Sequence, residues 1–141
     1  MKNRDLELAK VELVKKDFSL VIVKNEKIIF KTKKHGISGF LHAIEKLKTD
    51  LVGACVADKI VGEAAAMLCV YSGVSHVFAL TISAKGIKVL QDKNIDFVFE
   101  NKVLNILNRS KMEVCPFEKL ASSGSPKEVY VRLRSFANQL G

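Results

Sequence analysis

Apolar and polar residues follow two different spacings along this chain. In several stretches the apolar residues recur every three or four positions, which is typical of helices with one buried face. This spacing predicts helices over residues 5–16, 36–48, 61–71, 84–92 and 126–140. Short runs rich in β-branched and aromatic residues predict strands over residues 18–23, 27–32, 51–57, 74–82 and 96–100.

The pattern is weaker between residues 101 and 120. It predicts a short helix within 101–112 and a further helical turn over 115–120, where proline is tolerated near the start. Residues 51–57 are apolar throughout, as expected of a central strand that is covered on both faces.

The order of these elements predicts the fold class. A helix and a β-hairpin come first, and helices and strands alternate afterwards. Such alternation predicts an α/β protein, a three-layer α/β/α sandwich with a mixed sheet and helices on both faces. We see no linker and no repeat, so residues 1–141 are expected to form a single domain.

Composition narrows the range of partners. The chain has 141 residues and a formal net charge of +8, but most of the cations are lysines interspersed with glutamates. Arginine, the better reader of bases and phosphates, is scarce, so we do not expect a nucleic-acid partner. No apolar run approaches the length of a membrane span, and we see no secretory signal. We expect a cytoplasmic protein without membrane contact, and the sequence leaves a homo-oligomer open.

Residues 57–68 are the most informative stretch, because a predicted buried strand ends there at two charges and a helix follows. Ligand sites in α/β sheets lie at the carboxyl ends of strands, where Asp58 and Lys59 are expected, with Lys59 as the compensating charge. Gly62 would let a ligand approach the next helix closely. In such a pocket Asp58 or Glu63 could transfer protons. An alternative is that Asp58 only caps the helix, and the sequence leaves both interpretations open.

Residues 61–68, Val-Gly-Glu-Ala-Ala-Ala-Met-Leu, resemble the first motif of the zinc cytidine deaminases. The resemblance implies that Glu63 matches the glutamate that moves protons in that family, while Val61 occupies the position of the first zinc ligand. The second motif of the family, Pro-Cys-x-x-Cys, has no counterpart at residues 81–86. Because a catalytic zinc needs three protein ligands, we predict no bound metal, no other cofactor and no cytidine deamination.

Two further runs resemble a small bacterial family called domain of unknown function 1893. They are Ala-Asp-Lys-x-x-Gly-x-Ala-Ala-Ala at residues 57–66 and Cys-Pro-x-Glu at residues 115–118. The resemblance covers nearly the whole chain and implies a cytidine deaminase-like fold. It adds Cys115 and Glu118 to the candidate residues. The position of Cys115 just before a helix favours a thiolate, although neighbouring glutamates oppose it.

Two classes of function remain. The first is a domain that binds a small polar ligand, such as a nucleotide fragment, and its candidate residues are Asp58, Lys59, Gly62, Cys115 and Glu118. The second is an enzyme with Asp58 or Glu63 as acid/base and Cys115 as nucleophile or unusual metal ligand. Because two motifs in a protein of this size most economically serve one pocket, we expect Asp58 and Cys115 to lie at the same site.

Overall fold

The structure is a computed structural model, and it describes residues 3–107 and 115–139. Its centre is a single sheet of five strands, β1 (Leu20–Lys24), β2 (Lys27–Thr32), β3 (Cys55–Val61), β4 (His76–Ser83) and β5 (Asp96–Val103). Their order across the sheet is β2-β1-β3-β4-β5. β1 is antiparallel to β2 and β3, whereas β3, β4 and β5 run parallel. The predicted mixed sheet is therefore confirmed.

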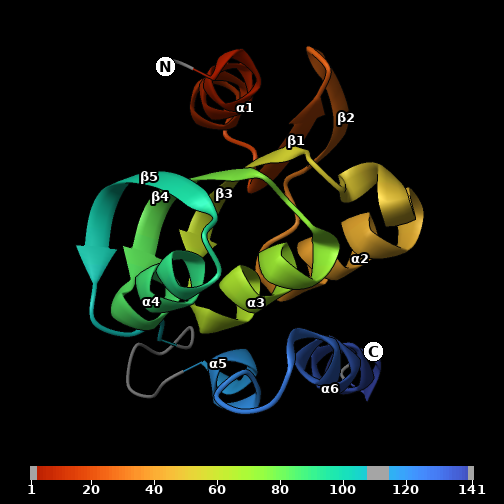
Figure 1. Ribbon diagram of the computed structural model, residues 1–141, viewed down its shortest axis with the longest axis vertical. Helices are drawn as coiled ribbons and strands as arrows, with labels where there is room; N and C mark the ends of the chain where they lie inside the picture. Colours follow the sequence, from red (N-terminus) through yellow and green to blue (C-terminus); the bar gives the residue numbers. More distant parts are fainter. Residues whose placement is uncertain (1–2, 108–114, 140–141) are drawn as a thin grey trace.

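Helices cover both faces of this sheet. They are α1 (Arg4–Lys15), α2 (Ile37–Leu47), α3 (Glu63–Ser72), α4 (Ala84–Asp92), α5 (Pro116–Leu120) and α6 (Pro126–Gln139), with a short 3-10 helix at Lys48–Leu51. α1 lies on one face, and α2, α3 and α4 lie on the other (Figure 1). α5 and α6 pack outside α3 and form an additional layer, which we call the C-terminal layer. No helix in the described part of the chain is long and apolar enough to cross a membrane.

Each face of the sheet has its own core. Beneath α1, the buried side chains of Ala9 and Leu13 pack on Ala57 and Phe78 of the central strands. The larger core lies on the opposite face and extends through α3 into the C-terminal layer, where Tyr71 stacks on Tyr130 with ring centroids 4.4 Å apart. Burial of each such large apolar side chain contributes roughly 1.5–3 kcal/mol, so these contacts fix the positions of the helices around β3.

The central strand differs from its prediction. It was expected over residues 51–57, yet β3 begins at Cys55 and continues through Asp58 to Val61. The reason is its pairing on both sides, because Asp58 lies opposite Leu20 of β1 and Ala79 of β4. These ladders hold the backbone extended past the two charges, so the following helix starts only at Glu63.

The structure also differs from the prediction after residue 100, where the spacing of apolar residues is weak. Residues 101–103 continue β5, where Asn101 pairs with Thr81 and Val103 with Ser83. The predicted helix is therefore wrong for these residues, because the parallel ladder with β4 determines their conformation. Residues 104–107 form no helix either, and the rest of that prediction, residues 108–112, lies outside the described residues. The helical turn after Cys115 and the closing helix are confirmed as α5 and α6.

Candidate functional site

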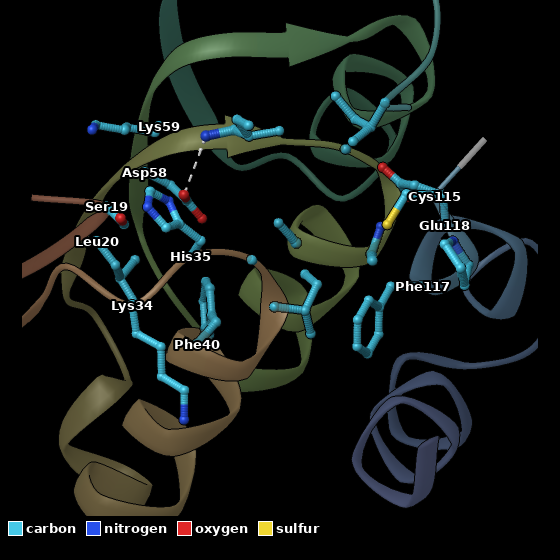
Figure 2. A pocket seen from close by; sticks show the side chains of 18 of the residues that line it. Ser19, Leu20, Lys34, His35, Phe40, Asp58, Lys59, Cys115, Phe117 and Glu118 are labelled. Atoms are coloured by element: carbon cyan, nitrogen blue, oxygen red, sulfur yellow. Dashed lines mark hydrogen bonds between the residues drawn. The ribbon is translucent and has the colours of Figure 1, made fainter. Parts of the chain in front are cut away.

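A cavity of about 570 Å³ opens between β3, the start of α2, the first turn of α3 and the C-terminal layer. Three aromatic residues, Phe40 of α2, Phe117 of α5 and Phe136 of α6, contribute to its walls. Two carboxyl groups and a thiol are among its ionisable side chains. Figure 2 places Asp58 at one end and Cys115 and Glu118 at the other. The two sequence motifs thus meet at one cavity, as expected.

Asp58 carries the only carboxyl at its end of the cavity, as far as the described residues show. Its Oδ1 accepts a hydrogen bond from the backbone N–H of Ile60 at 3.2 Å. Burial raises the pKa of Asp58 to about 7, although the backbone N–H groups of Ile60 and Lys59 oppose this shift. No cation among the described residues forms an ion pair with it. The protonated form of Asp58 is therefore favoured to a higher pH than in an ordinary aspartate.

The capping interpretation of Asp58 is wrong. The N-cap of α3 is Gly62, and no side chain caps the helix from that position. Asp58 lies in the middle of β3, four residues before the N-cap, because the strand extends further than the sequence indicated. Asp58 therefore lines the cavity and does not cap α3.

Lys59 does not compensate the charge of Asp58. Its ammonium group bonds to the carboxylate of Asp17 and lowers the pKa of that carboxyl group. The reason is strand alternation, which sends the side chains of successive residues to opposite faces of the sheet.

Lys59→Met should accordingly leave the midpoint of thermal unfolding nearly unchanged. The ion pair with Asp17 is exposed on the Asp17 side, whose side chain is 83% accessible, so its contribution is small. Thermal unfolding of the wild type and of Lys59→Met in the same buffer tests this. A large drop in the midpoint would mean that Lys59 supports the Asp58 carboxylate after all.

Glycine at position 62 leaves room for another side chain of the same protein, that of Glu118. The Glu118 carboxylate reaches over from α5, and its Oε2 accepts a hydrogen bond from the N–H of Ala64 at 2.8 Å. A Cβ at Gly62 would overlap Oε1 of Glu118 and lie 2.7 Å from Cγ1 of Ile106. Burial raises the pKa of Glu118, while the Ala64 N–H opposes the shift. An anion thus already occupies the start of α3.

Cys115 and Glu63 differ in their relation to the cavity. Cys115 is a half-buried free thiol that lines the cavity at the N-cap of α5. Glu63 is not among the lining residues. Burial raises its pKa, and Lys85 of α4 opposes this shift. Asp58, Gly62, Cys115 and Glu118 therefore line one cavity, and Glu63 lies outside it. Lys59 also contributes to the lining, although its ammonium group bonds to Asp17.

Comparison with known families agrees with this arrangement of motifs. The family model described as TM1506, domain of unknown function (DUF1893), matches residues 8–137. The chain belongs to this family. A crystal structure of a DUF1893 family protein, TM1506 from Thermotoga maritima, is similar over 96% of this chain and 92% of that one, with a TM-score of 0.85 and 27% identity. No curated protein matches the chain.

A more distant likeness concerns only the fold. The structure of RibD from Acinetobacter baumannii matches 68% of this DUF1893 chain, with a TM-score of 0.50 and 20% identity. The matched part is 33% of the RibD chain, so two thirds of that protein have no counterpart here.

The side chains of this DUF1893 protein do not fit a zinc ion. At the start of α3 stand Val61 and Gly62, and the β4–α4 junction carries Ser83 and Lys85, none of which supplies a thiolate or imidazole ligand. Among the described residues, no three His, Cys, Asp or Glu side chains lie close enough together to hold a metal ion.

The aromatic walls are the part of the site that the sequence analysis missed. Phe40, Phe117 and Phe136 stand at ordinary helical core positions, and nothing in the sequence separates a wall of a cavity from a filled core. His35, in the loop before α2, also lines the cavity and lies toward its Asp58 end (Figure 2).

Proposed function

We propose that this DUF1893 protein binds a small planar heterocycle, such as a nucleobase or nucleoside, with Asp58 as its anchor. The observation that carries the proposal is the placement of the Asp58 carboxyl group, without an ion-pair partner among the described residues, at one end of a cavity with aromatic walls. A volume of about 570 Å³ lies within the usual range of small-molecule sites.

The aromatic side chains and the carboxyl group that line the cavity suit different parts of such a ligand. Phe117 and Phe136 pack edge to face with ring centroids 5.1 Å apart, and together with the largely buried Phe40 they give the cavity an apolar aromatic lining, which suits a flat π system such as a base. Asp58 suits the polar edge, since a carboxylate accepts hydrogen bonds from ring and amino N–H groups. A molecule without an apolar body would leave the aromatic walls unused.

We further propose that this fold is a cytidine deaminase-like fold that works without zinc. The likeness in fold to RibD supports the first part. The side chains at the start of α3 and α4 support the second, because they provide none of the usual zinc ligands.

Binding of cytidine, adenosine and guanosine, measured by isothermal titration calorimetry, tests the proposal. We expect one of the three to bind at a single site and Asp58→Leu to weaken that binding by at least about tenfold, which corresponds to about 1.4 kcal/mol. Asp50→Leu, a matched change at an exposed aspartate, should leave it unaffected. Failure of all three to bind, or binding that survives Asp58→Leu, would contradict the proposal.

The pH dependence of binding should identify the edge of the base. Guanosine offers two adjacent N–H donors and would bind more tightly as the pH rises through about 7 and Asp58 ionises. Cytidine and adenosine offer a donor and an acceptor, which match the protonated carboxyl, so their binding would weaken over the same range. Asp58→Asn should remove either trend.

Catalysis at the same site is the second candidate function. A carboxyl group with a pKa of about 7 is well matched to proton transfer at neutral pH, and Cys115 lines the same cavity as a potential nucleophile. Chromatographic detection of turnover of the bound nucleoside, lost in Asp58→Asn, would move the assignment from binding to catalysis.

A further inference from the structure

A second, smaller cavity adjoins the first. It has a volume of about 270 Å³ and lies near the start of α4 and the end of α5. Two residues, Ile106 and Glu118, line both cavities, so the Glu118 side chain forms part of the partition between them.

The lining of the smaller cavity differs in chemistry from that of the larger one. It contains two ammonium groups, two hydroxyl groups and an amide, and these belong to Lys85, Lys119, Ser83, Ser122 and Asn105. Neither lysine forms an ion pair with a described residue. Ser83 is buried, and its Oγ accepts from the N–H of Gly86 while its own proton is not donated to any described residue.

The carboxyl group of Glu118 lies beside these groups. Its carboxylate accepts from the N–H of Ala64, and the charge of Lys85 counteracts the effect of burial on its pKa. Glu63 also lies close enough to interact with Lys85 and with Glu118, so the two lysines face two carboxyl groups, of which only Glu118 lines this cavity. The Ser122 hydroxyl already donates to the carbonyl of Lys119 at 2.9 Å, so the donors left for a ligand are the two ammonium groups, the Ser83 hydroxyl and the Asn105 amide, which line a space next to the end of the larger cavity.

We propose that the smaller cavity is a phosphate subsite and that the ligand of this protein is a phosphorylated nucleoside. This inference rests on the proposed function, because the base would occupy the larger cavity while its phosphate lies between Lys85 and Lys119. Phosphate oxygens are strong acceptors that match ammonium and hydroxyl donors. Asp58 and Lys85 thus bind opposite ends of the same ligand, the base and the phosphate.

Titration of the full-length protein with inorganic phosphate tests the subsite alone. We expect saturable binding of one phosphate, weakened at least about tenfold in Lys85→Met and in Lys119→Met. Lys88→Met, one turn further along α4, is the matched control and should bind as the wild type does. Asp58→Asn should also bind phosphate normally. Absence of saturable binding, or equal weakening in Lys88→Met, would overturn the subsite.

A second titration links the subsite to the base. We expect the 5′-monophosphate of the nucleoside that binds to be held more tightly than the nucleoside itself, and we expect this gain to disappear in Lys85→Met. Equal affinity of the two forms would overturn the inference while leaving the proposed function intact. Phosphate binding without any nucleoside binding would instead retain the subsite and reject the proposed function.

Discussion

Asp58→Asn should make the protein more stable at about pH 8, and the gain should vanish at about pH 4. The pKa of Asp58 rises on folding from its ordinary value of 3.8 to about 7 because burial disfavours the charged carboxylate. Between these two values the folded protein retains a proton that the unfolded chain releases. Wild-type stability therefore falls as the pH rises through this window, by an amount on the order of 3 kcal/mol.

Asparagine has no charge to bury at any pH, so the variant does not lose this stability. Its side-chain oxygen can still accept from the N–H of Ile60, as Oδ1 of Asp58 does. Urea denaturation of both proteins at intervals from about pH 4 to about pH 8 measures the difference. Asp50→Asn, at an exposed site, should keep the wild-type pH dependence. Parallel curves for the wild type and Asp58→Asn would show that the carboxyl titrates normally.

Gly62→Ala should destabilise the protein by about 1–3 kcal/mol, and the part of that loss due to Glu118 should disappear in a Glu118→Ala background, whereas the 2.7 Å approach to Cγ1 of Ile106 remains. The backbone of Gly62 has φ −100° and ψ −165°, which any residue can adopt, so the conformation does not require glycine. The constraint is space, since a Cβ there would overlap the Glu118 carboxylate.

A double-mutant cycle isolates this contact. Glu118→Ala alone should also destabilise the fold, because the N–H of Ala64 loses its partner. The two single losses should exceed that of the double variant by at least about 1 kcal/mol, since Gly62→Ala already displaces the carboxylate. Additive losses in urea denaturation would mean that Gly62 is needed for another reason.

The parts of the fold that could be predicted from sequence are those that local spacing determines. The helix over 84–92 is confirmed as α4, and its N-cap is equally local, because Ser83 Oγ accepts from the N–H of Gly86 at 3.0 Å, three residues away. The ends of β3 could not be predicted in this way. They depend on pairing with β1 and β4, whose residues are distant in sequence.

The candidate site, too, could be predicted from the sequence only in part. Asp58, Gly62, Cys115 and Glu118 stand in two recognisable motifs, and the structure brings them to one cavity. The contacts that these residues make could not be predicted from the sequence. The Glu118 carboxylate meets Ala64 across 54 positions, and the ammonium group of Lys59 turns to Asp17 because the strand continues past its predicted end.

The C-terminal layer has a consequence for biosynthesis. The whole sheet and α1 to α4 precede residue 104, whereas the wall that carries Cys115, Phe117 and Glu118 follows it. Chains begin to fold from their N-terminal part while the rest is still being translated. The Asp58 side of the cavity therefore leaves the ribosome well before the wall that encloses it. During that interval the nascent chain exposes the outer face of α3, where Tyr71 later meets Tyr130.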